Sequence, residues 1–319
     1  MTQELEVLTV GRVGVDFYAD EPHAGFGEAR TFQKSVGGSP TNVAVAAARL
    51  GRRAAVFTKV GDDGLGAYVR DALAEQFGVD TRFVGTDSTL QTPIVVAVMD
   101  PPEDPQFVFY RQPRAPDSTI QPDEVDMEVV RTVPVLWISA GALAVEPSRG
   151  TVRTLLAERA VSRHTILDLD YRASFWSAAD EARREIGSTL DVATAVLGNR
   201  AECEIAVGSS EPDAAADALL DRGVELAIVK LGGDGVLVAT SAGRAVVPPV
   251  HVEVVSGLGA GDAFGGALCH GLLSGWSPVE AVEFANAAGA LVASRLLCAD
   301  AMPTVVEVRE LLEGSRARR

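Results

Sequence analysis

The feature that most constrains the fold of this chain is a regular alternation of short apolar runs with longer helical stretches. The runs are rich in Val and Ile, and the stretches are rich in Ala, Leu, Glu and Arg. Because a strand followed by a helix and another strand favours parallel pairing, this order predicts an α/β protein, with a mostly parallel central sheet and helices on both faces. Strands are predicted at residues 5–10, 54–60, 93–99, 107–110, 133–138, 164–168, 192–197, 226–230 and 236–239. Helices are predicted at residues 40–50, 65–77, 147–163, 177–190, 200–207, 212–223, 262–273 and 278–297.

Two segments interrupt the alternation. Residues 13–32 and approximately 90–111 are extended and leave no room for a helix. We expect them to form a small sheet, a lid over the strand ends where α/β proteins bind ligands. Residues 1–319 are otherwise expected to be a single domain with these lid segments inserted. Such a sheet would expose an apolar face that favours a partner, and we expect this face to include Val95, Ala97, Val108 and Tyr110.

The composition excludes several classes of partner. The 28 Lys and Arg residues are outnumbered by 44 Asp and Glu residues, which gives a formal net charge of −16. An acidic surface repels nucleic acid and anionic membranes, and no uninterrupted apolar run is long enough to span a membrane. Three widely spaced cysteines predict neither a disulfide framework nor a zinc site. The acidic N-terminal stretch leads directly into a strand, so we expect a cytoplasmic protein without a signal peptide.

The strongest chemical signal is at residues 256–267, which read SGLGAGDAFGGA before a predicted helix. The glycines let backbone N–H groups approach a phosphate at the start of that helix. Asp262 is unexpected in an anion cradle because like charges repel, unless it accepts the proton of a hydroxyl that attacks the phosphate. The Gly-Lys-Ser/Thr of a P-loop is absent, and Asp262 stands where a dinucleotide fingerprint has its third glycine. The structural alternative is a flexible strand-to-helix turn.

Two N-terminal segments have both a structural and a functional interpretation. Residues 37–51, GGSPTNVAVAAARLG, begin a tightly packed helix capped by Ser39 or Thr41. In the functional interpretation, the glycine backbone and the Asn42 amide lie against the hydroxyls of a sugar. Asp16, after the first predicted strand, is either a loop residue or a ligand of two sugar hydroxyls.

Three later segments have the same two interpretations. Arg111 and Arg172 lie at or beyond strand ends, where they could clamp a carboxylate or phosphate or be ordinary surface arginines. Asn199 and Glu202, at the start of a helix, could orient water around Mg²⁺ or form a capping box. Lys230 begins the segment KLGGDG, which is either a hairpin turn or a backbone that flanks a nucleotide.

Taken in order, these segments resemble the PfkB carbohydrate kinases, also called the ribokinase-like family, over almost the whole chain. GGSPTNVAVAAARLGRRAAVFTKVGDDGLG is similar to the family's N-terminal signature, and GLGAGDAFGGAL is similar to the C-terminal one. Within the family, the likeness is closest to the kinases of 5-dehydro-2-deoxygluconate in myo-inositol breakdown. It is carried by GRVGVDFYAD, PPEDPQFVFYR, DLDYRASFW and FANAAGALVASRLLCADAMPT. Kinases of 2-dehydro-3-deoxygluconate have similar Tyr-Arg and Asp-Tyr-Arg elements.

The resemblance implies a ribokinase-like three-layer fold and transfer of a phosphoryl group from ATP to the 6-hydroxyl of a sugar acid. Asp262 would be the base, and the backbone of Gly259, Ala260 and Gly261 would form the anion hole. The residues that would bind the sugar acid are Arg12, Asp16, Gly38, Asn42, Tyr110, Arg111 and Arg172. Those near ATP would be Asn199, Lys230, Gly232, Gly235, Gly259, Gly261, Asn286 and Ala288, with Asn199 and Glu202 holding Mg²⁺ through water.

The sequence departs from the family at one point and leaves other functions to weigh. Ser256-Gly257 replaces the family's usual Asp-Thr, whose carboxylate in many members helps to hold a monovalent cation. A fructokinase-like enzyme has the same signatures. A nucleoside kinase would not need the paired Arg111 and Arg172, and a non-catalytic sugar- or nucleotide-sensing module would not need Asp262. The resemblance also implies a homodimer through the lids, each of which closes over its own site and excludes water.

Overall fold

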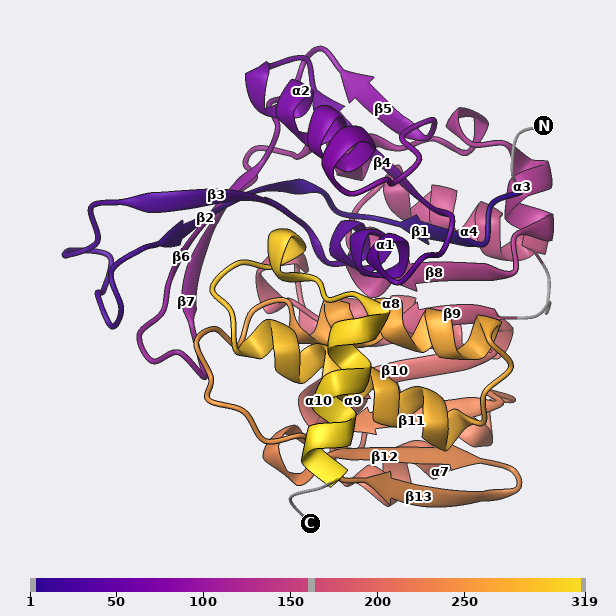
Figure 1. Ribbon diagram of the computed structural model, residues 1–319. Coiled ribbons are helices and arrows are strands. Elements are labelled where there is room, and N and C mark those ends of the chain that lie inside the picture. The colour runs from indigo at the N-terminus through magenta and orange to yellow at the C-terminus, as the bar shows by residue number, and fades with distance from the viewer. Residues whose placement is uncertain (1–3, 160–163, 317–319) are drawn as a thin grey trace.

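The computed structural model describes residues 4–159 and 164–316, and in these ranges nine strands form one large sheet between two layers of helices (Figure 1). The strand order is β13-β12-β11-β10-β9-β8-β1-β4-β5. Neighbouring strands are parallel, except for the antiparallel pairs β11–β12 and β12–β13. The strands are β1 Val7–Val10, β4 Ala54–Gly61, β5 Val84–Asp87, β8 Val135–Ser139, β9 His164–Asp168, β10 Ala195–Asn199, β11 Leu226–Lys230, β12 Val236–Thr240 and β13 Gly243–Val247. The predicted α/β fold is confirmed.

The helices cover both faces of this sheet. One face packs against α1 Ser39–Arg49, α2 Gly64–Asp71, α8 Ala260–Leu273, α9 Pro278–Ala293 and α10 Val305–Arg316. The other packs against α3 Met127–Thr132, α4 Ser148–Arg159, α5 Ala179–Gly187, α6 Arg200–Val207 and α7 Pro212–Leu220. None of the described helices is both long and apolar enough to cross a bilayer.

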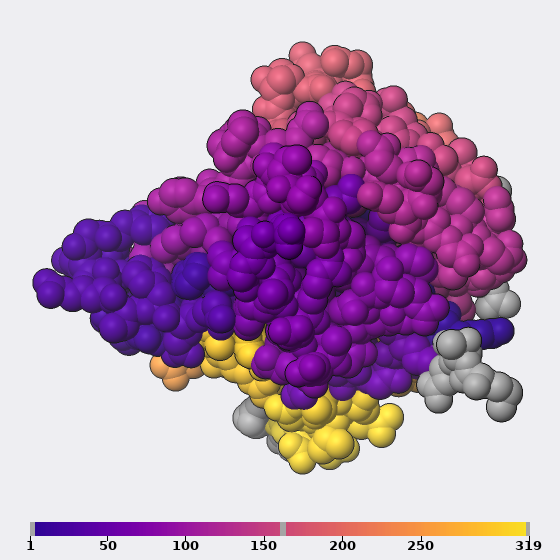
Figure 2. Space-filling model, turned by 90° about the horizontal axis from the view of Figure 1, so that it is seen from above, coloured from indigo at the N-terminus to yellow at the C-terminus, as the bar shows by residue number. Residues whose placement is uncertain are grey.

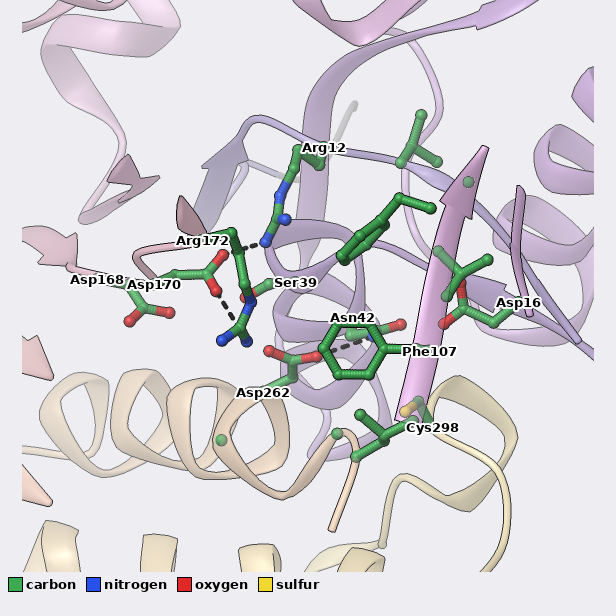
Figure 3. A pocket seen from close by; sticks show the side chains of 18 of the residues that line it. Arg12, Asp16, Ser39, Asn42, Phe107, Asp168, Asp170, Arg172, Asp262 and Cys298 are labelled. Carbon is green, nitrogen blue, oxygen red and sulfur yellow. Dashed lines mark hydrogen bonds and ion pairs between the residues drawn. The ribbon is translucent and has the colours of Figure 1, made fainter. Parts of the chain in front are cut away.

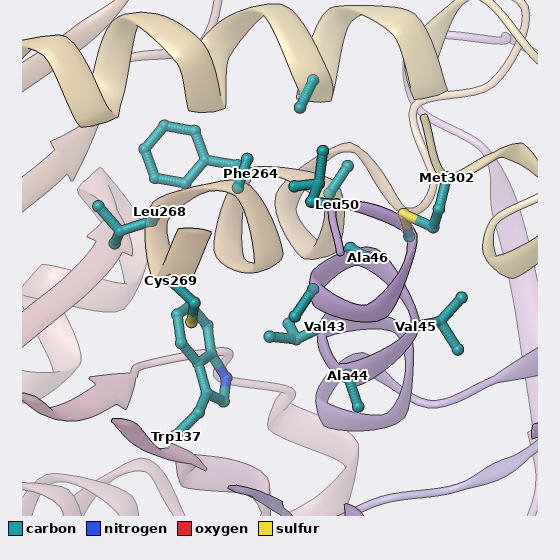
Figure 4. Close-up of a cluster of buried hydrophobic side chains, with 14 of the residues drawn as sticks. Val43, Ala44, Val45, Ala46, Leu50, Trp137, Phe264, Leu268, Cys269 and Met302 are labelled. Carbon is teal, nitrogen blue, oxygen red and sulfur yellow. The ribbon is translucent and has the colours of Figure 1, made fainter. Parts of the chain in front are cut away.

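The period-two alternation of the strands divides the core into two halves. On β8, Val135 and Trp137 belong to the cluster under α1 and α8, whereas Leu136 and Ile138 belong to the cluster on the opposite face. All four side chains are buried, as expected for a strand covered on both sides. Figure 4 shows the first cluster, in which Trp137 lies beside the short side chains of α1. This packing holds the N-termini of α1 and α8 next to each other.

A second sheet of four strands stands out from the body on one side (Figures 1 and 2). Its order is β3-β2-β6-β7, with strands β2 Gly14–Ala19, β3 Phe32–Gly37, β6 Ile94–Val98 and β7 Gln106–Tyr110. This is the small sheet expected from the two irregular segments.

The predicted apolar face of the small sheet is wrong, because it mixes residues from both sides. Val95 pairs with Phe109 and Asp16, and Ala97 pairs with Phe107, on the side facing the body. Val108 pairs with Val96, whose side chain points to the opposite side from those of Val95 and Ala97. Val108 and Tyr110 therefore lie on the outer side of the sheet. The same side also has Val96, and Phe17 and Ile94, which pack against the core, so its exposed apolar part is formed by Val108 and Tyr110.

Other differences from the predicted elements concern edges and ends. The elements β5, β13, α3 and α10 were not predicted. The predicted helix at residues 65–77 is α2 continued by the π-helical turn Ala72–Gln76. The helix predicted at residues 278–297 ends earlier, at Ala293. The predicted end of the helix at residues 147–163 lies outside the described residues.

Candidate active site

A cavity of about 190 Å³ lies where the carboxyl ends of β1, β9 and β11 meet the N-termini of α1 and α8, beneath the small sheet (Figure 3). This is the edge where parallel sheets place their ligand sites. Most of the residues that the sequence singled out meet here, although they come from segments far apart in the chain. The cavity lining includes Arg12, Asp16, Gly38, Asn42, Arg111, Arg172, Glu202, Lys230, Gly259, Gly261 and Asp262.

The turn into α8 presents a bare backbone to this cavity. Gly259 is the N-cap residue of the helix, with φ 79°, a left-handed conformation that favours glycine, and no side chain caps the helix. A Cβ at this position would lie 2.6 Å from the Sγ atom of Cys298, so the turn also has no space for a side chain. The first N–H groups of a helix have no partner within the helix. They are therefore available to an anion in the cavity, and the helix dipole favours negative charge there.

Asp262 lies in the first turn of α8, with its carboxylate facing the start of α1. The Nδ2 atom of Asn42 donates a hydrogen bond to its Oδ2 atom over 2.8 Å. Burial raises the pKa of Asp262 to about 6, although hydrogen bonds with Asn42 and Ser39 favour the ionised form. At neutral pH the group is thus mostly a carboxylate that can still accept a proton, as a general base requires.

The start of α1 differs from the predicted cap. Gly38 is the N-cap residue, with φ 99°, and no side chain caps the helix. Thr41 donates instead to the backbone carbonyl of Arg12 over 2.8 Å. A Cβ on Gly38 would lie 2.5 Å from the same oxygen, which explains why glycine is needed here. The contact ties the segment after β1 to α1 and so sets the position of Asn42.

Asp170 is a functional candidate that sequence reasoning missed. It is 4% exposed and joins three neighbouring strand ends: it pairs with Arg12 after β1, accepts a hydrogen bond from Ser139 over 2.9 Å, and contacts Arg172 over 3.2 Å (Figure 3). Burial opposes its ionisation, but the charges of Arg12 and Arg172 lower its pKa below the usual range. The segment DLDYR could have drawn attention to Asp170, because a carboxylate two residues before an arginine can orient that arginine.

A second charged group lies at the ends of β9 to β11. Asp168 is 4% exposed, and its Oδ1 atom has no hydrogen-bond partner among the described residues. Burial and neighbouring carboxylates raise its pKa to about 8, although Lys230 opposes this. Burial also disfavours the charge on Lys230, but Glu202 and Asp168 outweigh it and raise the lysine's pKa. Lys230 therefore stays charged beside the turn into α8, where a Cβ on Gly261 would lie 3.7 Å from its Nζ atom.

Asn199 and Glu202 form the capping box that was the structural interpretation of their spacing. The Asn199 side chain accepts from the Glu202 N–H over 2.9 Å, and the Oε2 atom of Glu202 accepts from the Asn199 N–H over 2.7 Å. Glu202 nevertheless lines the cavity near Asp168. Its other oxygen is not used by the box, so the cap and a contact with a hydrated cation are compatible.

The part of the cavity under the small sheet is rich in oxygen acceptors. Asp16 and Asn42 each have a buried Oδ1 atom without a partner among the described residues. The rings of Phe107 and Phe109 line the same cavity. Unpaired buried acceptors are costly, and hydroxyl groups are the donors that would satisfy them. Rings above and acceptors around a small cavity fit a polyhydroxylated ligand such as a sugar.

Arg111 and Tyr110 differ from their predicted roles. Arg111 lines the cavity but pairs with the buried carboxylate of Asp117 over 2.6 Å. The guanidinium groups of Arg12 and Arg111 both stack on Phe175, at 4.9 and 5.1 Å from the ring centroid. Tyr110 is 58% exposed on the outer side of the small sheet and does not line the cavity, which corrects its predicted contact with the sugar. Because side chains alternate along β7, Tyr110 points to the opposite side from Phe107 and Phe109, which line the cavity.

A neighbouring cavity of about 390 Å³ shares Lys230 and Gly261 with the first one. It is lined by Gly232 and Gly235 of the β11–β12 turn and by Asn286 of α9. Ala288, predicted to lie near the nucleotide, faces the core and is 1% exposed, because it is on the other side of α9. Gly289, Ala290 and Ala293 line the cavity in its place.

Comparison with known proteins decides the family. The model of the pfkB family carbohydrate kinases matches residues 4–305. The chain belongs to the PfkB family. The chain is 32% identical to a 5-dehydro-2-deoxygluconokinase of Geobacillus thermodenitrificans, with 99% of this chain and 95% of that protein covered. It is also 32% identical to one of Photobacterium profundum, with 97% and 95% covered.

Solved PfkB structures support the same conclusion. The fructokinase of Vibrio cholerae O395, in its fructose-, ADP- and calcium-bound form, is 27% identical, with a TM-score of 0.85 over 97% of this chain and all of that one. A PfkB protein from Polaromonas sp. JS666 is 26% identical, with a TM-score of 0.81 over 93% of this chain and 99% of that one. This PfkB protein is therefore a phosphotransferase that acts on a sugar hydroxyl, as the two signatures predicted.

Proposed function

We propose that this PfkB kinase transfers the γ-phosphoryl group of ATP to the 6-hydroxyl of 5-dehydro-2-deoxy-D-gluconate. The observation that carries the proposal is the placement of Asp262. A half-buried carboxylate with a raised pKa faces a cavity lined by acceptors for hydroxyl groups, directly after a turn whose N–H groups are free for an anion. The names of the relatives with full coverage support the choice of sugar acid.

In this proposal Asp262 orients the 6-hydroxyl and accepts its proton late in the transfer. Asn42 holds the carboxylate by its Oδ2 atom and leaves Oδ1 free of that contact. The charge of a phosphoryl group in transfer is spread over its oxygens, so fixed N–H donors in a dry site stabilise it more than water does. Gly259, Ala260 and Gly261 supply these donors, and the Lys230 ammonium lies beside them.

The residues also fit ATP with Mg²⁺. The cavity that contains Gly232, Gly235 and Asn286 adjoins the turn into α8, as a nucleotide whose terminal phosphate reaches Gly261 would require. The described residues contain no group of three or more metal ligands, so we propose that Asn199 and Glu202, together with Asp168, hold the ion through water. Mg²⁺ would neutralise charge on the phosphates. The side chains themselves orient its hydration shell and keep Lys230 charged.

Arg172 is the group we propose for the carboxylate of the sugar acid. Arg12 and Arg111 each already pair with a buried carboxylate, Asp170 and Asp117. The side chain of Arg172 is 41% exposed, and its contact with Asp170 leaves donors of its planar guanidinium free. We therefore propose that Arg172 binds the carboxylate directly. Arg12 and Arg111, which stack on Phe175, supply fixed positive charge beside it.

The experiment that tests the function is a substrate panel with ATP and Mg²⁺. We expect the highest kcat/KM for 5-dehydro-2-deoxygluconate, a lower value for 2-dehydro-3-deoxygluconate, and low values for fructose, ribose and adenosine. Identification of the product as the 6-phosphate by NMR checks the position. Equal efficiency with fructose would rule out the sugar-acid proposal and leave a fructokinase-like enzyme.

We further propose that two copies pair through the outer side of the small sheet. Val108 and Tyr110 are 40% and 58% exposed there, next to Phe17 and Val96. An apolar face of this kind, on a sheet with open edges, is typical of an association surface.

A further inference from the structure

The hydroxyl of Tyr18 lies between two groups that sequence reasoning did not connect. Tyr18, on β2, is fully buried, and its oxygen is 2.9 Å from the Oδ2 atom of Asp16 and 2.9 Å from the Sγ atom of Cys298. Asp16 and Cys298 both line the cavity (Figure 3). Two side chains of β2 and the distant Cys298 thus form one continuous line of polar contacts at the sugar end of the site.

The direction of these contacts follows from a count of protons. A phenol has one proton, and an ionised carboxylate only accepts. The Tyr18 O–H is within donating distance of both neighbours. When Asp16 is ionised, its carboxylate is the stronger acceptor and takes the single Tyr18 proton, so the Cys298 thiol, which has its own proton, then donates to the Tyr18 oxygen. Burial and nearby carboxylates raise the pKa of both Tyr18 and Cys298, so both keep their protons. The chain of donation runs from thiol to phenol to carboxylate.

Both ends of this chain are held in place by backbone. The carboxylate of Asp16 packs against Gly37 so closely that a Cβ there would overlap it. The sulfur of Cys298 packs against Gly259, where a Cβ would lie 2.6 Å away. One end therefore abuts β3 of the small sheet, and the other abuts the turn that precedes Asp262. The Oδ1 atom of Asp16 remains without a partner among the described residues.

We propose that Tyr18 and Cys298 are positioning residues for the kinase reaction: their hydrogen-bond chain holds the Asp16 carboxylate ionised and in place at the cavity wall, where it accepts a sugar hydroxyl. The proposal rests on the proposed function in one respect, that Asp16 binds the sugar. Tyr18 acts on Asp16 through the Oδ2 atom, to which its hydroxyl donates. Cys298 acts through Tyr18, because a donor to the phenol oxygen strengthens the O–H as a donor in turn.

The charged and titratable groups around Asp16 determine what removal of Tyr18 should do. Burial, together with the charge of Asp262, raises the pKa of Asp16 to about 7, although the Tyr18 hydroxyl and Arg12 lower it. Tyr68 of α2 and Cys298 are the other titratable groups coupled to it. Loss of the Tyr18 hydroxyl removes a contact that favours the ionised form. The carboxylate should then ionise only at a higher pH.

The decisive variant is Tyr18→Phe, with Tyr110→Phe on the exposed side of the small sheet as its control. We expect Tyr18→Phe to raise the KM of the sugar about tenfold at pH 7, as for loss of a hydrogen bond to a charged group, with the KM of ATP unchanged. The acid limb of kcat/KM for the sugar should move to higher pH, so that most of the loss is recovered near pH 9. A loss independent of pH, or equal losses in both KM values, would overturn the proposal.

Cys298 is tested with a conservative pair of substitutions. Cys298→Ser keeps a donor and should retain a sugar KM within about twofold of wild type. Cys298→Ala should shift KM and the pH limb in the same direction as Tyr18→Phe, but less. Cys269→Ala, at a buried thiol that packs in the core and does not line the cavity, controls for lost packing. If serine and alanine give the same defect, sulfur packing rather than donation explains the residue.

A measurement without turnover separates this proposal from the proposed function. In protein labelled with ¹³C at aspartate carboxyl groups, Asp16→Asn identifies the Asp16 signal, and its titration is followed in wild type and Tyr18→Phe. We expect the midpoint to move to higher pH in Tyr18→Phe. An unchanged midpoint would overturn the proposal whichever sugar the enzyme prefers, and a panel without a sugar-acid preference would overturn only the proposed substrate.

Discussion

The large sheet and the small sheet contribute to the cavity in different ways. The large sheet is covered by helices on both faces, so its strand side chains are used in packing, and its functional groups lie at or beyond the strand ends. Arg12, Asp170 and Arg172 are such groups. The small sheet covers the cavity with one face, and it contributes side chains from within its strands, such as Asp16 and Phe109.

This difference predicts which substitutions affect chemistry and which affect binding. Groups at the ends of the large sheet and on α8 are fixed by a core packed on both sides, which favours accurate placement of reacting atoms. Residues of the small sheet have one covered side only, so they suit recognition of the substrate and contact with a partner.

Asp262→Asn should lower kcat by about 10²–10⁴-fold, because the amide keeps the shape but does not accept the proton. The KM of ATP should change little. Asp213→Asn, which removes an exposed carboxylate, is the control, and thermal unfolding verifies the fold. In the wild type, kcat should fall as the pH decreases through about 6, since the ionised form of Asp262 is the active one. Near wild-type kcat in folded Asp262→Asn would show that the base lies elsewhere.

Arg172→Gln should lower kcat/KM for the sugar acid by about 1.5–3 kcal/mol, as for loss of a charge-assisted hydrogen bond. Stability should be nearly unchanged, because Asp170 keeps Arg12 and Ser139 as partners. Arg111→Gln is the contrasting variant: it leaves the buried Asp117 without its arginine, so it should lower Tm more than Arg172→Gln does. If both variants lose the preference for the sugar acid equally, the proposed difference between Arg172, which binds the substrate, and Arg111, which stabilises the fold, is contradicted.

Val108→Asp should separate the proposed dimer, and Val95→Asp should not. The two residues lie on opposite sides of the small sheet, so Val108 would meet a partner, whereas Val95 faces the cavity. Light scattering at micromolar concentration measures the mass, and sugar KM measures the effect on the site. We expect a monomer with measurable activity for Val108→Asp, and a dimer with a raised sugar KM for Val95→Asp. A monomeric wild-type protein would contradict the assembly itself.

Prediction from the sequence was most successful where local pattern and packing agree. The central strands were identified because covered strands are almost continuously apolar, as in β11 Leu226–Lys230, which has the predicted bounds. Edge elements such as β13 Gly243–Val247 were missed, since four of its five residues are at least partly exposed and its pattern is mixed. The two faces of the small sheet were confused because alternation separates the sides of one strand but does not give the register between β6 and β7, which places Val96 and not Val95 opposite Val108.

The sequence by itself determined the α/β fold, the family and the turn that ends in Asp262, because glycine spacing, strand-helix alternation and the two signatures are local properties of the chain. Only the tertiary structure decided which charged groups meet. Asp170 joins Arg12, Ser139 and Arg172, and Tyr18 joins Asp16 to Cys298, across segments that are distant in the chain. No local pattern contains such partners, because parallel strands bring their ends together only after their intervening helices have packed.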